Sequence, residues 1–179
     1  MGSAEQTPRL TTGESRGFRG RMRCLGVTMP RPHLPVIGLQ SIMKPIPNGV
    51  QGQYALRVEP AHLANTFKDS ILPPVFSTPY LILIMENAAL NAIRQYLEAG
   101  ESAVGTRVDV RHLVATPVGR EVVGHAEVTG SEGRKIFFRV WAMDGKEEIG
   151  AGTHERTVVD ISRIIERMTV KYGPTPAGT

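Results

Sequence analysis

Three residues in the middle of the chain have side chains that can transfer protons or attack as nucleophiles: Thr78, Glu86 and His112. Glu86 stands out because it interrupts an apolar run, Tyr-Leu-Ile-Leu-Ile-Met at 80–85. Burying a carboxylate in such surroundings costs several kcal/mol of stability unless the group is paired, so an unpaired one is expected to have a functional role. Two interpretations are equally open. Glu86 is either a structural carboxylate satisfied by the backbone or by a cation, or the base or nucleophile of a site.

His112 ends the sequence Asp-Val-Arg-His and precedes a Leu-Val-Ala-Thr-Pro loop, which places it where a strand meets an opening. A histidine there suits proton transfer near neutral pH, although an exposed surface histidine is the simpler interpretation of this residue alone. Thr78 is followed by Pro79 and therefore predicts a helix N-cap with proline at the first helical position. Its second interpretation is a hydroxyl that points into a pocket at the helix N-terminus, where backbone N–H groups can hold an oxyanion.

The other histidines have weaker claims on chemistry. His125 and His154 alternate with apolar neighbours, which already explains them as residues of a sheet face. No group of His, Cys and Asp has metal-ligand spacing, and the chain contains no glycine-rich phosphate loop after a strand and no GxSxG motif. We therefore expect no metal site.

The elements that must position these residues begin with a strand at 51–58, where Tyr54, Leu56 and Val58 alternate with polar residues. Residues 59–74 are rich in loop signals, with one short helical turn expected around 61–65. A helix is predicted from Pro79 to about Leu97, ending at Gly100. Because its first half is apolar on all sides, this helix should be buried by surrounding structure.

Four β-rich runs follow at 103–112, 121–129, 135–144 and 147–159, and the breaks at 131–133 and 144–145 are typical of hairpin turns. A strand, a buried helix and four more strands predict an α+β fold in which a five-stranded antiparallel sheet wraps around one central helix. Residues 160–171 predict a short amphipathic helix.

Composition divides the chain into three parts: a disordered basic extension at 1–46, one domain at 47–160, and a short helix with a frayed tail at 161–179. Seven basic and two acidic residues lie within 1–44, whereas the remainder holds 14 basic and 15 acidic residues. The folded part is thus close to neutral, and we expect no nucleic-acid partner. The longest apolar run is too short to cross a bilayer and the N-terminus lacks a secretory signal, so we expect a cytoplasmic protein without membrane contact.

Five motifs occur in order in this chain: Val-Phe-Ser-Thr at 75–78, Leu-Ile-Met-Glu at 83–86, Gly-Thr at 105–106 leading to His112, Ala-Thr-Pro-Val-Gly at 115–119, and Glu-Ile-Gly-Ala-Gly-Thr-His-Glu-Arg at 148–156. With spacings of 8 residues from Thr78 to Glu86 and 26 from Glu86 to His112, they resemble the fluoroacetyl-CoA thioesterase family of hotdog proteins. The resemblance covers about residues 47–159.

This resemblance implies a hotdog fold and an acyl-CoA thioesterase that releases a short-chain acid, substituted or not, and free CoA. Thr78, Glu86 and His112 would be the catalytic set. Gly105 would lie by the acyl group, with Leu72 and Phe76 as further substrate contacts. Coenzyme A is part of the substrate, so no cofactor is expected. The resemblance also implies a homodimer with its pockets at the subunit interface.

Two departures from the family pattern concern specificity. Leu72 stands where the fluoroacetyl-specific member has an aromatic residue, and Asn87 replaces a tryptophan, which argues against fluoroacetyl-CoA itself as the substrate. Two other functions stay open. An acyl-CoA hydratase or dehydratase would need an Asp–His pair near the helix start, and none is visible. In a non-catalytic domain that binds an acyl or aromatic ligand, the free-energy cost of burying the Glu86 carboxylate would have no functional return.

Overall fold

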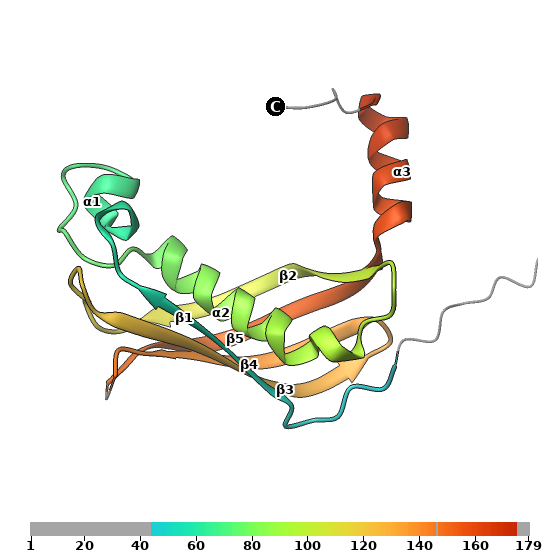
Figure 1. Cartoon of the computed structure of the whole chain (residues 1–179), viewed down its shortest axis with the longest axis horizontal. Coiled ribbons are helices and arrows are strands. Elements are labelled where there is room, and N and C mark those ends of the chain that lie inside the picture. The colour runs from blue at the N-terminus through green and yellow to red at the C-terminus, as the bar shows by residue number, and fades with distance from the viewer. Residues whose placement is uncertain (1–43, 146, 175–179) are drawn as a thin grey trace, which may run out of the picture. The chain divides into compact units, whose positions relative to one another are not determined.

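The computed structural model describes residues 44–145 and 147–174 (Figure 1). The expected basic extension therefore lies outside the described residues except for its last positions. Among these, Lys44 Nζ lies 3.1 Å from Glu98 Oε1, and Ile46 is buried in the core. The domain thus includes Ile46, which the sequence had placed in the extension.

Five antiparallel strands form one sheet in the order β1-β3-β4-β5-β2. The strands are β1 (Gln51–Arg57), β2 (Glu101–His112), β3 (Glu121–Glu132), β4 (Lys135–Met143) and β5 (Glu148–Asp160). Gly133 and Gly145 adopt φ angles of 57° and 89° in the turns that join the last three strands, a region that glycine enters without strain. The predicted strands and hairpins are confirmed, with ends that differ by up to three residues.

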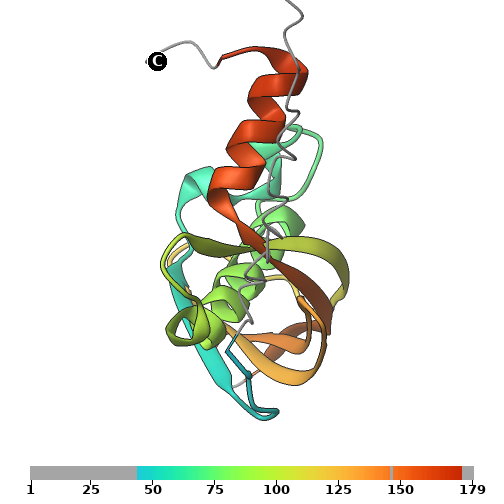
Figure 2. The same ribbon diagram turned by 90° about the vertical axis from the view of Figure 1, so that its right-hand side faces the viewer.

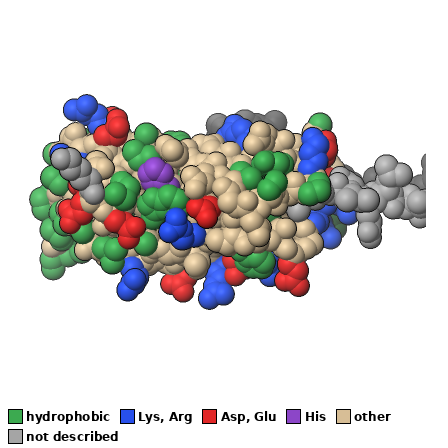
Figure 3. Space-filling model, turned by 90° about the horizontal axis from the view of Figure 1, so that it is seen from below, with side chains coloured by type: hydrophobic (Ala, Val, Ile, Leu, Met, Phe, Trp, Pro, Cys, Tyr) green, Lys and Arg blue, Asp and Glu red, His purple; other side chains and the backbone are tan. Residues whose placement is uncertain are grey.

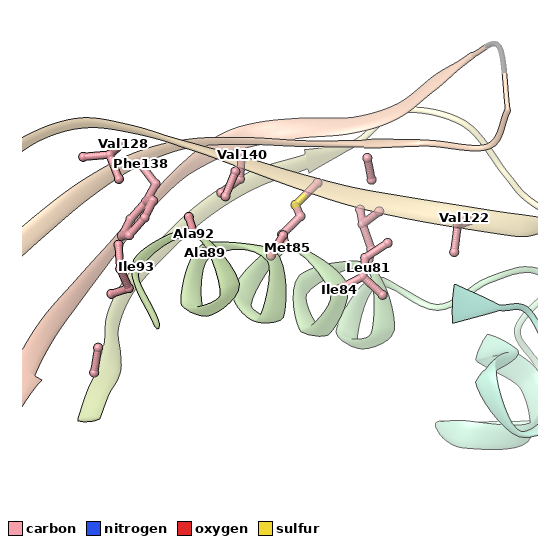
Figure 4. Packing of buried hydrophobic residues seen from close by; sticks show 14 of the residues in the cluster. Leu81, Ile84, Met85, Ala89, Ala92, Ile93, Val122, Val128, Phe138 and Val140 are labelled. Atoms are coloured by element: carbon pink, nitrogen blue, oxygen red, sulfur yellow. The ribbon is translucent and has the colours of Figure 1, made fainter. Parts of the chain in front are cut away.

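Helix α2 (Thr78–Ile93) lies in the concave face of the sheet, which curls around it when the helix is viewed along its axis (Figure 2). Its sheet-facing side chains include Leu81, Ile84, Met85 and Ile93, and they meet residues of β3 and β4 such as Val122, Phe138 and Val140 (Figure 4). Burial of each large aliphatic side chain contributes about 1.5–3 kcal/mol, so this contact is the main source of stability. The predicted α+β arrangement around a buried helix is confirmed.

Two glycines let the sheet approach the backbone of α2 directly. A Cβ on Gly52 of β1 would overlap the Ala88 carbonyl and the Ala92 amide, and one on Gly124 of β3 would lie 2.5 Å from the Ile84 carbonyl. No side chain could occupy either position without displacing the helix. The position of α2 on the sheet is therefore fixed by backbone contact.

The start of α2 differs from the sequence prediction. Ser77 is the N-cap, Thr78 is the first helical residue and Pro79 the second, and neither hydroxyl caps the helix. The prediction of Thr78 as N-cap is wrong because Ser77, with φ −84° and ψ 148°, already has the extended backbone of a cap. The α-helix ends at Ile93 and a 3₁₀ turn (Arg94–Tyr96) completes the predicted length.

Shorter helices flank this unit. A 3₁₀ turn (Pro60–His62) and helix α1 (Ala64–Phe67) occupy the segment where one helical turn was expected. Helix α3 (Ile161–Tyr172) confirms the predicted C-terminal helix, and the Asp160 carboxylate caps it by accepting the Arg163 N–H at 3.1 Å. No helix of the described residues is long and apolar enough to cross a membrane.

The outer face of the sheet and its edge at β2 carry different exposed side chains. Seen from below, charged side chains of both signs are scattered over the visible face without a large patch of one sign (Figure 3). Among the described residues, edge strand β2 pairs only with β5, and Gly105 to Asp109 are exposed on both of its faces. Val104 and Val108 on this strand are 41% and 38% exposed. A long strand with exposed apolar side chains and a free edge is a surface that proteins normally cover.

Candidate functional site

The first polar group lies at the start of α2, where Thr78 meets His112 from the end of β2. Thr78 Oγ1 lies 3.1 Å from His112 Nδ1, a hydrogen bond between residues 34 positions apart. Helix α2 supplies the hydroxyl from its first residue, Thr78. Strand β2 supplies the imidazole from its last residue, His112, which is paired with Gly150 of β5. Two residues of the predicted set are thus brought together.

The imidazole of His112 is suited to accept a proton. Burial lowers its pKa below 6.5, with a hydrogen bond to the backbone of Val114 acting in the opposite direction. The ring is therefore neutral at neutral pH and can take the Thr78 proton at Nδ1. Its Nε2 is buried and has no hydrogen-bond partner among the described residues.

Glu86 lies two turns further along α2, on the side of the helix next to strands β2 and β5. Its side chain is 38% exposed, so it is half-buried, not the fully buried carboxylate that the apolar run suggested. It lines a cavity of about 430 Å³ together with other residues of that helix side and one residue of β5: Pro79, Ile82, Leu83, Asn87, Leu90 and Arg156. The volume is in the range of small-molecule sites, which span about 300–1,000 Å³.

Two residues of β5, His154 and Arg156, surround the Glu86 carboxylate. His154 Nε2 lies 3.7 Å from Glu86 Oε1, and Arg156 Nη1 donates a hydrogen bond of 3.2 Å to the Glu86 carbonyl oxygen. His154 is 2% and Arg156 7% exposed. The expectation that His154 is only a sheet-face residue is therefore incomplete, because its face is the inner one. The Thr-His-Glu-Arg motif at 153–156 was the signal, since it places two ionisable residues on one side of a strand.

Gly105 lies beside Glu86 for a steric reason. A Cβ at this position would overlap Glu86 Oε1 and come within 3.1 Å of the His154 ring. The register of β2 against β5 shifts between Gly105 and Arg107, a bulge that interrupts the ladder beside the carboxylate. Gly105 therefore lies directly beside the Glu86 carboxylate.

The remaining two predicted contacts are Leu72 and Phe76. Leu72 is half-buried in the segment between α1 and α2. Phe76 is 1% exposed and packs in the core, so core packing already accounts for this residue. Within 44–145 and 147–174, no group of three or more His, Cys, Asp or Glu residues could hold a metal ion.

Two polar clusters therefore lie along one helix. We call Thr78 with His112 the helix-start cluster, and Glu86 with His154 and Arg156 the mid-helix cluster. Because Thr78 is helical, the eight residues to Glu86 separate the two clusters by about 12 Å along the helix axis, at roughly 1.5 Å per residue. A single protomer does not bring all three predicted catalytic residues together.

Comparisons with known proteins show which family this chain belongs to. Residues 58–162 match the family described as "Fluoroacetyl-CoA-specific thioesterase". A fluoroacetyl-CoA thioesterase from Streptantibioticus cattleyicolor is 43% identical over 106 residues, which are 59% of this chain and 74% of that protein. The structure of the fluoroacetyl-CoA thioesterase FlK is similar at a TM-score of 0.67, with 34% identity, 74% of this chain and 99% of that chain covered.

A second solved structure supports the same fold. A thioesterase superfamily member from Thermus thermophilus has 27% identity and a TM-score of 0.67, with 73% of this chain and 98% of that chain covered. The resemblance noted in the motifs is confirmed, as is the hotdog arrangement of sheet and central helix. This chain belongs to the fluoroacetyl-CoA-specific thioesterase family, and it is a thioester hydrolase of the hotdog fold.

Proposed function

We propose that this protein hydrolyses the thioester of a short-chain, substituted acyl-CoA with Thr78, Glu86 and His112 as its catalytic residues. The observation that carries this proposal is the Thr78–His112 hydrogen bond at the start of α2, on the helix whose open side holds Glu86 and the cavity. The FlK structures include complexes with fluoroacetate and CoA and with acetyl-CoA, which supports an acyl-CoA in this position.

The start of α2 suits the acyl carbonyl. Ser77 provides no side-chain cap, so its hydroxyl leaves the N–H groups of the first turn to other acceptors. Those N–H groups and the positive end of the helix dipole stabilise an oxyanion as it forms. As the C–S bond breaks, the Thr78–His112 pair passes one proton to the leaving thiolate of CoA, and the pair regains a proton from the water that hydrolyses the acyl group.

Glu86 acts on the acyl carbon, either as the general base for water or as the nucleophile of an acyl-enzyme. The separation of about 12 Å from Thr78 along the axis prevents both residues of one protomer from reaching the same carbon. We therefore propose a homodimer in which the glutamate of one protomer works with the threonine and histidine of the other. The free edge and exposed valines of β2 support pairing at that strand.

One assay tests the activity. Purified protein is given a panel of acyl-CoAs, from acetyl-CoA and its α-substituted derivatives to long-chain forms, and release of free thiol is recorded. We expect turnover of the short acyl groups and little of the long ones. No thiol release above the uncatalysed rate from any member of the panel would overturn the proposed function.

A complementation experiment tests the shared site. Glu86→Gln and His112→Ala proteins, each expected to be about 10²-fold slower or more, are unfolded together and refolded as a mixture. If each site draws on two protomers, a mixed dimer keeps one intact site and activity returns. If one protomer supplies all three residues, every site in the mixture lacks one of them and activity stays low. Light scattering should report about twice the 19.5 kDa chain mass.

A further inference from the structure

The mid-helix cluster contains a residue whose role the proposed function does not use. We propose that His154 is a positioning residue for Glu86, holding the guanidinium of Arg156 against α2 and so fixing where the Glu86 carboxylate meets the cavity. The expected effects on kcat rest on the proposed function, whereas the placement of the Glu86 carboxylate by His154 and Arg156 does not.

The hydrogen bonds of His154 define its tautomer. Nδ1 lies 2.8 Å from the carbonyl oxygen of Arg107, and a carbonyl only accepts, so Nδ1 carries the proton. The Arg107 carbonyl lies just past the bulge in β2, where the ladder register has shifted. Burial lowers the pKa of His154, and the charge of Arg156 lowers it further, so the ring is neutral at neutral pH and Nε2 holds a lone pair.

Arg156 uses that lone pair as one of three acceptors. Its Nη1 lies 3.3 Å from His154 Nε2 and also donates to the Glu86 carbonyl, while Nη2 donates to the Ala103 carbonyl on β2. The guanidinium thereby joins α2, β2 and β5 at one point, which its planar set of donors allows and a lysine would not. Without His154 Nε2, the buried Nη1 group would lose one of its two acceptors, a change that favours reorientation of the guanidinium.

The carboxylate of Glu86 lies in a slot that these groups define. Oε1 is 3.7 Å from His154 Nε2, beyond hydrogen-bond distance, and the missing side chain of Gly105 leaves the other side open. His154 therefore acts by contact and through Arg156, not by a direct hydrogen bond to the carboxylate. Displacement of a reacting group by 1 Å costs about 10²-fold in rate, so small shifts of this slot matter.

Two substitutions of one residue separate positioning from proton transfer. His154→Leu removes the acceptor for Arg156, whereas His154→Gln keeps an amide acceptor near the place of Nε2 but cannot titrate. We expect kcat to fall about 10- to 100-fold in His154→Leu with a smaller change in KM, and most of the loss to be recovered in His154→Gln. Equal losses in both variants would identify a proton-transfer role and overturn the inference.

The matched control is His125→Leu, because His125 is also a partly buried strand histidine but stacks on Trp141 outside both clusters. We expect its kcat per folded molecule to be unchanged. A loss as large as that of His154→Leu would show that any strand histidine is needed, and would overturn the specific role of His154. Thermal melting of all variants corrects the rates for unfolded protein.

Coupling to Glu86 provides the second test. If His154 acts through the carboxylate, His154→Leu should change kcat less than about threefold in a Glu86→Gln background, because the group it positions is already disabled. A full 10- to 100-fold further loss would overturn the inference.

A readout without turnover separates this inference from the proposed function. The ¹³C carboxyl resonance of Glu86, assigned by its absence in Glu86→Gln, should shift in His154→Leu and return toward wild type in His154→Gln. An unchanged resonance in His154→Leu would overturn the inference even if the enzyme is active. A shift and recovery would support it even if no acyl-CoA is hydrolysed.

Discussion

The helix-start and mid-helix clusters occupy the same helix but are held in different ways. Thr78 and His112 share one hydrogen bond, Thr78 is exposed, and His112 Nε2 has no partner among the described residues. Around Glu86, by contrast, two buried side chains of β5 make four hydrogen bonds with one another, with α2 and with β2. The first cluster has a single internal hydrogen bond, whereas the second ties α2, β2 and β5 together beside the Glu86 carboxylate and leaves only one buried side-chain atom, Arg156 Nε, without a partner among the described residues.

This difference predicts which cluster tolerates change. The mid-helix cluster is pre-organised, so its reacting group should be sensitive to charge and position. The helix-start cluster has fewer internal contacts, so substitutions there should affect rate more than stability.

The largest effect is expected for Glu86→Gln, which keeps the shape of the side chain and removes its charge. We expect kcat to fall by about 10² or more while the fold persists. The matched control is Glu98→Gln, which removes a carboxylate that pairs with Lys44 at the far end of the helical segment. Thiol release and thermal melting are measured on both proteins. A well-folded Glu86→Gln enzyme with wild-type kcat would remove Glu86 from the catalytic set.

A comparable loss is expected for His112→Ala, because it removes the acceptor of the Thr78 proton. Combined with Glu86→Gln, the loss should fall well short of the product of the single effects, since the residues act as one unit. His125→Ala is the control for the loss of a partly buried imidazole. Independent, multiplicative effects would show that the two clusters do not serve one reaction.

A smaller rate effect is expected for Thr78→Ala, together with almost no loss of stability. Ser77 is the N-cap and Thr78 donates no capping hydrogen bond, so the loss of about 1 kcal/mol that a cap deletion usually causes should not occur. Thr78→Ser should restore rate. Ser77→Ala is the informative partner, because Ser77 Oγ is buried without a hydrogen bond and its removal should leave the melting temperature unchanged or higher. A large loss of stability in Thr78→Ala would contradict this account of the helix start.

The smallest effect concerns pH. Burial lowers the pKa of His112, His125 and His154 below 6.5. Between pH 6.5 and the lowered pKa values, the unfolded chain binds protons that the folded chain does not. The contribution of these histidines to the free energy of unfolding is therefore fully present above pH 6.5 and is lost as the pH falls through the lowered pKa values. Melting temperature should therefore be lower at about pH 5.5 than at about pH 7.5. His125→Gln should reduce that difference without changing the acid limb of kcat, which belongs to His112.

Most of the fold could be predicted from the sequence because its signals are local. Alternation in the strands, glycines at hairpin turns and an apolar helix sufficed for the sheet and α2. The exposure of Glu86 was also within reach, since Leu83, Asn87 and Leu90 lie within one turn of it on the same helix side.

What could not be predicted depends on contacts between distant segments. Ser77 is the N-cap in place of Thr78 because its backbone is extended, and its N–H donates to the carbonyl of His62 in a separate segment. The position of His154 depends on a bulge in β2 that turns the Arg107 carbonyl toward it, 47 residues away. Likewise, nothing near Thr78 in the sequence indicates that His112 is its partner.

The glycines beneath α2 have a consequence for how this enzyme could change its substrate in evolution. Gly52 and Gly124 anchor the helix by its backbone on the sheet side, so the fold makes little demand on the opposite side. Leu83, 37% exposed, and Asn87, whose amide donates to the Leu83 carbonyl of its own helix, line the cavity there. Mutations at Leu83 and Asn87 can therefore change which acyl group the enzyme prefers without changing the contacts that fix the helix on the sheet.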